Sequence, residues 1–178
     1  MTNKKLTENF SLNEFIKTDP TDYQLQLLQL LADNLQSVRN FLQEFALPKK
    51  SVSISINSGV RTEADYERLI KNGYNPSKTS DHFCGYQLQA KPTLGAADIS
   101  VKNCSLSLKE IAAKIIEWDK NGLVHFGQVI YEKNPKTGGE WIHLGNDPHQ
   151  IFNFNIVVER KKYLMSLDNG KTYKAFKL

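Results

Sequence analysis

Three short polar clusters lie beside apolar or small residues in the middle of this chain of 178 residues. One contains His82, the next contains Asp98, and the last contains Glu140 and His143. Two neutral imidazoles and one carboxylate are the ligand types and the number of ligands that a catalytic Zn²⁺ site uses, with a fourth position left for water. Ligands need only converge in space, so such a site requires a fold that brings three distant segments together. The sequence therefore predicts one Zn²⁺ ion bound by His82, Asp98 and His143.

The glutamate of the last cluster, Glu140, suits the role of a base. We expect it to accept a proton from the water at the metal. Glu140 and His143 are three residues apart, so on a regular strand their side chains point to opposite faces. The two can share a site only if Glu140 lies at the edge of the strand or if a bulge intervenes, which the glycines at 138–139 would permit.

A strand-like segment and a helix-like segment meet at Arg61. Apolar and polar residues alternate just before this corner, and Thr62 with Asp65 forms a helix-capping pattern just after it. Such a corner projects a side chain into a site, where a guanidinium can bind a substrate carboxylate or an oxyanion. We therefore expect Arg61 to act in catalysis and in substrate binding. A surface arginine paired with a nearby acid is the alternative.

Four motifs follow one another along the chain: Ser58-Gly59-Val60-Arg61-Thr62, Ser80-Asp81-His82, Gly95-Ala96-Ala97-Asp98 and Glu140-Trp141-Ile142-His143. In this order they resemble the motifs of the zinc D-Ala-D-Ala carboxypeptidases and L-alanyl-D-glutamate endopeptidases, a family that shares its core with the Hedgehog signalling domain. The resemblance extends, more loosely, from about Phe10 to His143. It implies that Ser80 orients the metal site or contacts the substrate.

The resemblance implies a hydrolase that acts on the bacterial cell wall. Its expected activity is the zinc-dependent hydrolysis of peptidoglycan stem peptides by metal-activated water. The bond is either a D-Ala-D-Ala terminus, cut by a carboxypeptidase, or the L-Ala-D-Glu bond, cut by an endopeptidase, and the sequence leaves both open. A compact single domain without a leader fits a phage endolysin or a virion-borne enzyme of cell wall degradation. A bacterial cytoplasmic dipeptidase is a second enzymatic hypothesis.

The spacing of one motif differs from the family pattern. Fifteen residues lie between His82 and Asp98, more than the family places there. Gly85 keeps the family's spacing from His82, so we interpret residues 86–94 as an inserted loop or hairpin. The insertion motivates a hypothesis of another class, a catalytically silent cell-wall-binding or structural virion module on the same fold. The presence of Glu140 and Arg61 favours the enzyme instead.

Composition and charge exclude other classes of function. The net charge of +4 is small and scattered, and no basic stripe alternates with aromatic residues, so we expect no nucleic-acid partner. No apolar run approaches the ~20 residues of a membrane span, and the polar start lacks a signal-peptide core. We therefore expect a monomer that is cytoplasmic when synthesised and acts at the cell wall after release or as part of a virion.

The two cysteines, Cys84 and Cys104, are too few for a disulfide framework, although a bridge between them stays open as an alternative. Cys84 follows His82 by two residues and could compete as a thiolate ligand. A buried and inert thiol is the simpler expectation.

Hydrophobic periodicity predicts a single α+β domain over residues 1–178, with a core at 10–149 and a C-terminal β extension at 150–178. A long amphipathic helix should begin at an N-cap at Asp19, and its leucine stripe should pack on the core rather than form a dimer seam. A capping box at Ser107 predicts another helix. We expect a central antiparallel sheet with helices packed mainly on one face and the zinc site on the open side.

The last residues alternate in the manner of strands at 151–158, 163–167 and 172–176. The segment Asp168-Asn169-Gly170 should form the hairpin turn between the last two. We expect this tail to pack as a β extension at the edge of the sheet. Binding of a partner or of a cell-wall polymer is the alternative.

Overall fold

A computed structural model of the chain describes residues 4–74, 76–85, 93–151 and 162–177. The strands are β1 (Ser53–Ser58), β2 (Ala96–Lys102), β3 (Phe126–Lys133), β4 (Glu140–Asn146), β5 (Lys162–Ser166) and β6 (Lys174–Ala175). They form one sheet in the order β1-β2-β4-β3-β5-β6. Neighbouring strands are antiparallel except β3 and β5, which run parallel. The predicted α+β class is confirmed, whereas the sequence does not predict the parallel pairing of β5.

Helices and 3₁₀ turns connect the described strands. They are α1 (Leu12–Phe15), α2 (Asp22–Leu42), η1 (Gln43–Phe45), α3 (Glu63–Lys71), η2 (Asp81–Phe83), α4 (Leu108–Lys120) and η3 (Pro148–Gln150). Capping boxes at Thr62 and Ser107 begin α3 and α4 as predicted. α2 begins later than predicted, because Thr21 and not Asp19 is its N-cap. The Thr21 hydroxyl and the Gln24 side chain each accept a hydrogen bond from the other residue's N–H, so both N–H groups are satisfied.

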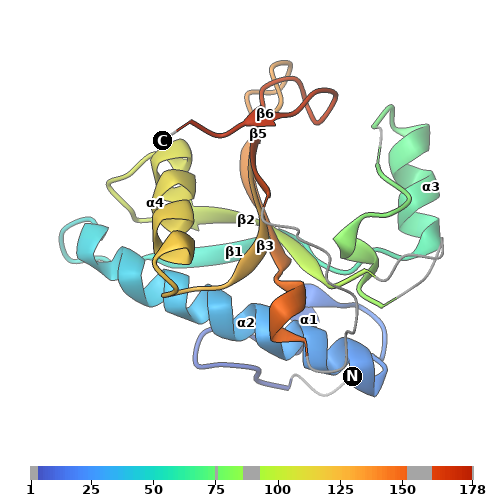
Figure 1. The fold of residues 1–178 in the computed structure, drawn as a ribbon, viewed down its shortest axis with the longest axis horizontal. Helices are drawn as coiled ribbons and strands as arrows, with labels where there is room; N and C mark the ends of the chain where they lie inside the picture. The colour runs from blue at the N-terminus through green and yellow to red at the C-terminus, as the bar shows by residue number, and fades with distance from the viewer. Residues whose placement is uncertain (1–3, 75, 86–92, 152–161, 178) are drawn as a thin grey trace.

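One face of the sheet carries the hydrophobic core. α2 and α4 lie against this face, whereas α3 stands apart from both of them (Figure 1). The leucine stripe of α2 is fully buried within the chain at Leu28, Leu31, Leu35, Val38 and Leu42. It packs with α4 and with the inward residues of the sheet in one apolar cluster. The stripe therefore packs on the core as predicted, because it is not exposed for a dimer seam.

The alternation of side chains along the strands separates this core from a polar face. Ile99 of β2 and Leu144 of β4 are fully buried in the core. Their neighbours Asp98 and His143 therefore point to the other side of the sheet. The polar residues gather on the face that α2 and α4 leave uncovered.

The C-terminal residues extend the sheet beyond β3. β5 and β6 form an antiparallel hairpin with the predicted turn, in which Asn169 and Gly170 adopt positive φ angles of 62° and 76°. Nearly all of the strand predicted at 151–158 lies outside the described residues. Within the described part of the chain, no helix combines the length and the apolar character needed to cross a lipid bilayer.

Candidate metal centre

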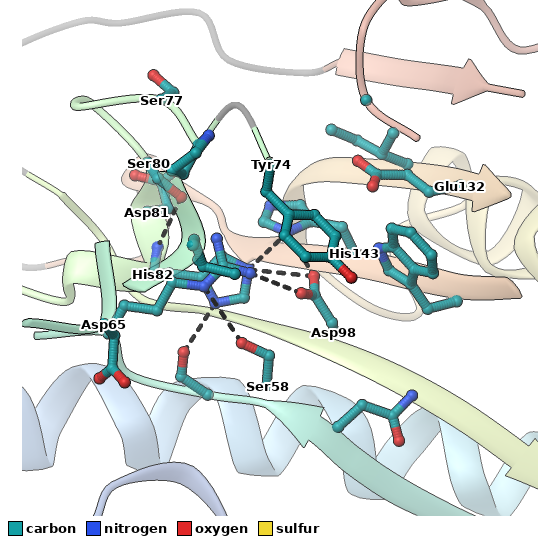
Figure 2. Close-up of a pocket in the computed structure, with 18 of the residues that line it drawn as sticks. Ser58, Asp65, Tyr74, Ser77, Ser80, Asp81, His82, Asp98, Glu132 and His143 are labelled. Atoms are coloured by element: carbon teal, nitrogen blue, oxygen red, sulfur yellow. Dashed lines mark hydrogen bonds and ion pairs between the residues drawn. The ribbon is translucent and has the colours of Figure 1, made fainter. Parts of the chain in front are cut away.

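The open face of the sheet forms the floor of a cleft of about 890 Å³ (Figure 2). α3 and the loop after it supply one wall, which includes Leu69 and Tyr74. The C-terminal hairpin supplies another, which includes Leu164 and Tyr173. A cleft of this size with mixed polar and apolar lining can admit a ligand as large as a short peptide.

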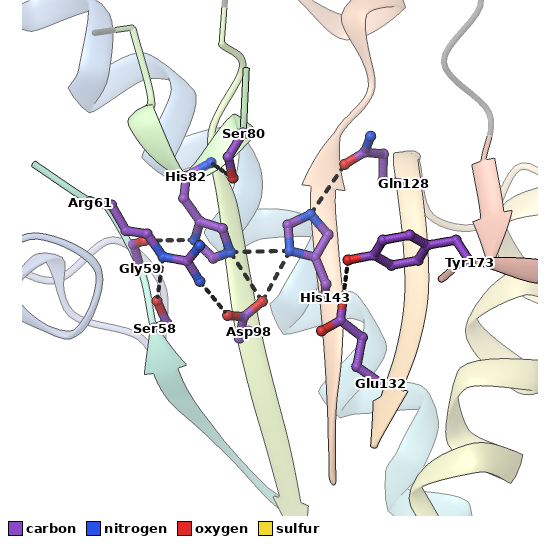
Figure 3. Close-up of polar contacts among 10 residues, drawn as sticks. All are labelled: Ser58, Gly59, Arg61, Ser80, His82, Asp98, Gln128, Glu132, His143 and Tyr173. Atoms are coloured by element: carbon purple, nitrogen blue, oxygen red, sulfur yellow. Dashed lines mark hydrogen bonds and ion pairs between the residues drawn. The ribbon is translucent and has the colours of Figure 1, made fainter. Parts of the chain in front are cut away.

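His82, Asp98 and His143 meet in this cleft (Figure 3). Asp98 of β2 lies directly opposite His143 of β4, and the η2 turn supplies His82. Nε2 of His82 and Nδ1 of His143 are 3.1 Å apart, and Oδ1 of Asp98 lies 3.1 Å from the first atom and 3.0 Å from the second. All three residues are buried. The predicted ligand atoms therefore form a nearly equilateral triangle.

The ring of His82 is held in one tautomer. Its Nδ1 lies 2.8 Å from the carbonyl oxygen of Gly59, and because a carbonyl can only accept, Nδ1 carries the proton. Nε2 then presents a lone pair to the other two ligands. The backbone N–H of Arg61 donates to the His82 carbonyl at 2.8 Å, and the Ser80 hydroxyl accepts a hydrogen bond from the His82 N–H at 3.4 Å. Ser80 thus orients the turn that carries His82, and its contact with substrate stays a prediction.

The ring of His143 is also oriented by a hydrogen bond from its other nitrogen. Its Nε2 lies 3.2 Å from Oε1 of Gln128, which accepts the ring proton at this nitrogen and leaves Nδ1 to face the other two residues. Nε2 of His82, Oδ1 of Asp98 and Nδ1 of His143 therefore face one another. One proton can bridge only one of these contacts, whereas one cation can neutralise all three. The group can hold a metal ion, and binding of the ion would displace the proton that His143 otherwise donates to Asp98.

Burial and charge shift the pKa of each member of this group. Burial lowers the pKa of His82, and Asp98 opposes this only in part. Burial also acts to lower the pKa of His143, but the hydrogen bond and the charge of Asp98 outweigh it and raise that pKa. Burial would raise the pKa of Asp98, yet the two imidazoles hold it well below its usual range. At neutral pH, Asp98 is therefore a carboxylate and His82 is neutral.

Arg61 contacts the centre through Asp98. Its Nη2 lies 2.9 Å from Oδ2 of Asp98, and its Nε lies 3.3 Å from the Ser58 hydroxyl oxygen. Asp98 thus uses one carboxylate oxygen for the triangle and the other for the guanidinium. The alternative of an arginine paired with a nearby acid is realised, but the acid is the candidate ligand itself. Arg61 therefore orients Asp98, and its contact with substrate stays a prediction.

Hydrogen bonds join the two ends of the segment that the sequence analysis interprets as an insertion. The N–H of Gly85 donates to the carbonyl and to the hydroxyl oxygen of Thr93, at 2.9 and 3.0 Å. The Asp81 carboxylate accepts a hydrogen bond from the Leu94 N–H at 3.0 Å. Asp81 is thus a structural residue that joins the η2 turn to the end of this segment. Residues 86–92 lie outside the described part of the chain.

Cys84 lies close to the centre in sequence but does not belong to it. It is fully buried in the hydrophobic core, and both cysteines are free. Burial, with repulsion from Asp81, raises its pKa to about 12. The thiol is therefore protonated at neutral pH and supplies no thiolate ligand. The prediction that this thiol is buried is confirmed.

The position of Glu140 corrects its predicted role as the base of this centre. β4 runs without a bulge from Glu140 to His143, so the two side chains point to opposite faces. The carboxylate forms an ion pair with Nζ of Lys133 at 2.7 Å, and this contact holds the pKa of Glu140 below its ordinary value. The glycines at 138–139 lie in the loop before β4 and do not supply the required irregularity. Glu140 is therefore not at the centre.

A different carboxylate, that of Glu132, faces the cleft. β3 pairs with β4 so that Ile130 lies opposite His143, and Glu132 lies two residues further along, opposite Trp141. Ile130 points to the same face as its partner His143, and Glu132 shares that face because it lies two residues from Ile130 on β3. Glu132 and His143 therefore point to the same side of the sheet. Glu132 lines the cleft and is only 9% exposed.

Glu132 is the site residue that the sequence patterns do not single out. Burial raises its pKa above the ordinary value, and the charge of Asp98 adds to this, whereas His143 opposes it. Its Oε1 accepts a hydrogen bond from the Tyr173 hydroxyl at 3.1 Å. The available signal is a glutamate in a largely apolar strand, the same kind of signal that identifies Asp98. This signal identifies a site residue only when the pairing of β3 with β4 is known.

The fold and the site together define a class of protein: an α+β domain with a buried His-Asp-His centre in an open cleft. Comparison of the chain with protein-family models, with curated proteins and with solved structures finds no match. A functional assignment must therefore rest on the residues of this chain.

Proposed function

We propose that this chain is a zinc-dependent peptidase that hydrolyses peptidoglycan stem peptides. The observation that carries the proposal is the convergence of three donor atoms, from His82, Asp98 and His143, in an open cleft. The choice of a peptidoglycan peptide comes from the resemblance of the surrounding motifs to the zinc D-Ala-D-Ala carboxypeptidases and L-alanyl-D-glutamate endopeptidases.

The donor set suits Zn²⁺ in number, type and spacing. Two ligands at about 2.0–2.1 Å from a tetrahedral ion lie about 3.3 Å from each other. The three donor atoms lie 3.0 to 3.1 Å apart, so small side-chain movements satisfy that geometry. Contacts with Gly59, Gln128 and Arg61 orient the three ligands, as outer contacts do in metal sites. A bound Zn²⁺ with an open position would lower the pKa of its water to about 7 and polarise a peptide carbonyl.

Glu132 is the residue to which we assign the role predicted for Glu140. It shares a face with His143, and its raised pKa brings it towards the range in which a carboxylate both accepts and returns a proton. It would take the proton of the attacking water and pass it to the amine that leaves. Arg61 would hold Asp98 in place and offer its remaining N–H groups to the oxyanion.

Elemental analysis of the purified protein, paired with mass spectrometry of muropeptides with and without chelator, tests this proposal. We expect about one equivalent of zinc. We also expect a chelator-sensitive loss of D-Ala or a cut after L-Ala, and the product masses name the bond. Zinc without a cut would favour the catalytically silent module. Absence of zinc from the purified protein and failure to take it up would contradict the metal centre.

Glu132→Gln and Glu140→Gln form a matched pair for the proton transfer. Glu132→Gln should keep zinc and lower kcat by roughly 10²–10⁴-fold, the usual contribution of general base catalysis. Glu140→Gln changes a carboxylate on the other face and should leave zinc content and kcat near the wild-type values. Wild-type turnover in Glu132→Gln, or its collapse in Glu140→Gln, would overturn the assignment of the base.

A further inference from the structure

The C-terminal hairpin reaches the cleft beside Glu132. β5 pairs in parallel with β3, and the pairing ends with Ser166 opposite Glu132. The chain then turns, and the N–H of Asn169 donates a hydrogen bond to the carbonyl of Lys133 at 3.0 Å. The turn after β5 is thus anchored to the end of the strand that carries Glu132.

Asp168 fixes the shape of this turn. Its carboxylate accepts hydrogen bonds from the hydroxyl and the N–H of Thr172 at 2.6 and 2.9 Å, from the Ser166 hydroxyl at 2.8 Å and from the Lys171 N–H at 3.1 Å. These bonds, those from Thr172 above all, lower the pKa of Asp168 to about 2. Because all these donors converge on one carboxylate, the residue after Thr172 is closely restrained.

That residue is Tyr173, whose hydroxyl donates to Oε1 of Glu132 at 3.1 Å (Figure 3). Gly170 leaves room for the hydroxyl, because a Cβ at this position would lie 3.0 Å from the Tyr173 oxygen. The φ angle of Gly170, +76°, also favours glycine. Tyr173 is 47% exposed, so its ring contributes little to the core. The polar contact that the structure gives its hydroxyl is the hydrogen bond to Glu132.

We propose that Tyr173 is a positioning residue for Glu132, an inference that rests on the proposed function. Its hydroxyl occupies one oxygen of the carboxylate, and within the described residues no hydrogen bond occupies the other, which could accept a proton from water. Among the residues that the structure describes, Tyr173 is the only hydrogen-bond donor to this carboxylate. Without it, the Glu132 side chain can rotate away from the centre. The C-terminal hairpin is then part of the catalytic cleft rather than an appended binding module.

A second tyrosine of the same hairpin offers a matched control. Tyr163 of β5 donates its hydroxyl to Oδ2 of Asp119 at 2.5 Å, and Oδ1 of Asp119 accepts a hydrogen bond from the Phe126 N–H at 2.9 Å. Asp119 belongs to α4 and is buried on the helix-covered side of the sheet. Both tyrosines therefore donate to a buried carboxylate, one in the cleft and one at the core.

Tyr173→Phe and Tyr163→Phe can be compared by steady-state kinetics on muropeptides, by thermal unfolding and by zinc content. Tyr173→Phe should lower kcat roughly tenfold or more, because a hydrogen bond to a charged group is lost, and should leave KM and zinc content unchanged. Tyr163→Phe should lower Tm and leave kcat and KM unchanged. In a Glu132→Gln background, Tyr173→Phe should cause no further loss, because it acts only through that carboxylate.

A crystal structure of Tyr173→Phe gives a readout that does not depend on turnover. We expect the Glu132 carboxylate to leave its wild-type rotamer. An unchanged rotamer, an unchanged kcat, or a raised KM at wild-type kcat would each overturn the positioning role. A wild-type protein that binds no zinc or cuts no muropeptide would instead refute the proposed function, and the rotamer would still decide whether Tyr173 holds Glu132.

Discussion

The two faces of the sheet give neighbouring residues of one strand opposite surroundings. Leu144 faces α2 and α4 and is fully buried among aliphatic side chains. His143 is 8% exposed on the other face, but its ring contacts an imidazole, a carboxylate and a side-chain amide. Burial alone does not distinguish the two residues. One face is closed by apolar packing, whereas the other is held by hydrogen bonds and stays accessible from a cleft.

The difference indicates where stability and function should separate. On the helix-covered face, each side chain contributes by the apolar area that it removes from water. On the cleft face, polar groups pay for desolvation and gain a fixed geometry, so their net contribution to stability is small. Substitutions at adjacent positions should therefore change different properties.

The largest expected effect is the loss of metal in His143→Ala. Removal of a ligand should weaken zinc binding by more than about 100-fold, since the loss of an outer contact already costs about 10–100-fold. Elemental analysis after dialysis and competition with a chromogenic chelator measure this. The exposed His149 of η3 is the matched control, and His149→Ala should keep its zinc. Full zinc occupancy in His143→Ala would mean that the ion binds elsewhere. The contrast between the two faces of the sheet would then not hold.

Leu144→Ala should act on stability instead. The loss of a fully buried leucine side chain should lower the free energy of unfolding by about 2–5 kcal/mol. Urea denaturation of the two proteins measures the difference. The folded fraction should still bind zinc in the wild-type ratio, and a folded Leu144→Ala protein without zinc would mean that the two faces are not independent.

The smallest expected effect is on the pH dependence of stability. It arises from the thiol of Cys84, which is buried on the core side of the sheet. Burial raises its pKa from 9.0 to about 12, so the folded protein keeps a proton that the unfolded chain releases. The contribution of Cys84 to stability is therefore complete below about pH 9 and is lost as the pH rises towards 12. Between about pH 8 and 10 the free energy of unfolding should fall by about 1 kcal/mol.

Denaturant titrations of the wild type and Cys84→Ala at both pH values measure this loss. Cys84→Ala should have a lower stability throughout, because it leaves a cavity, but a flatter dependence on pH. An equal decline in both proteins would assign the alkaline loss to other groups.

The sequence predicts the elements and the ligand set because both depend on local patterns. Capping boxes at Thr62 and Ser107 and the period of the α2 stripe are readable from short segments. Asp98 is readable because a charged residue between small and apolar neighbours in a strand needs a partner. These signals do not depend on which strands become neighbours.

The position of the candidate base and the edge of the sheet depend on pairing between distant strands. Glu140 matches a motif, but the alternation along β4 turns it away from His143, and no bulge reverses this. Glu132 faces the centre only because of the register between β3 and β4. The parallel contact of β5 with β3, which brings Tyr173 to the cleft, likewise joins segments that no local pattern links.

The hydrogen bonds between Gly85 and Thr93 make the geometry of the centre independent of the number of residues that separate the two. Because these two residues are tied together, the number of residues between them does not set the distance from His82 to Asp98. Each doubling of such a segment adds only about 0.6 kcal/mol of closure entropy. The contacts of Gly85, Thr93 and Leu94 at the two ends of the segment thus help to hold His82 and Asp98 in place, whatever the number of residues between them.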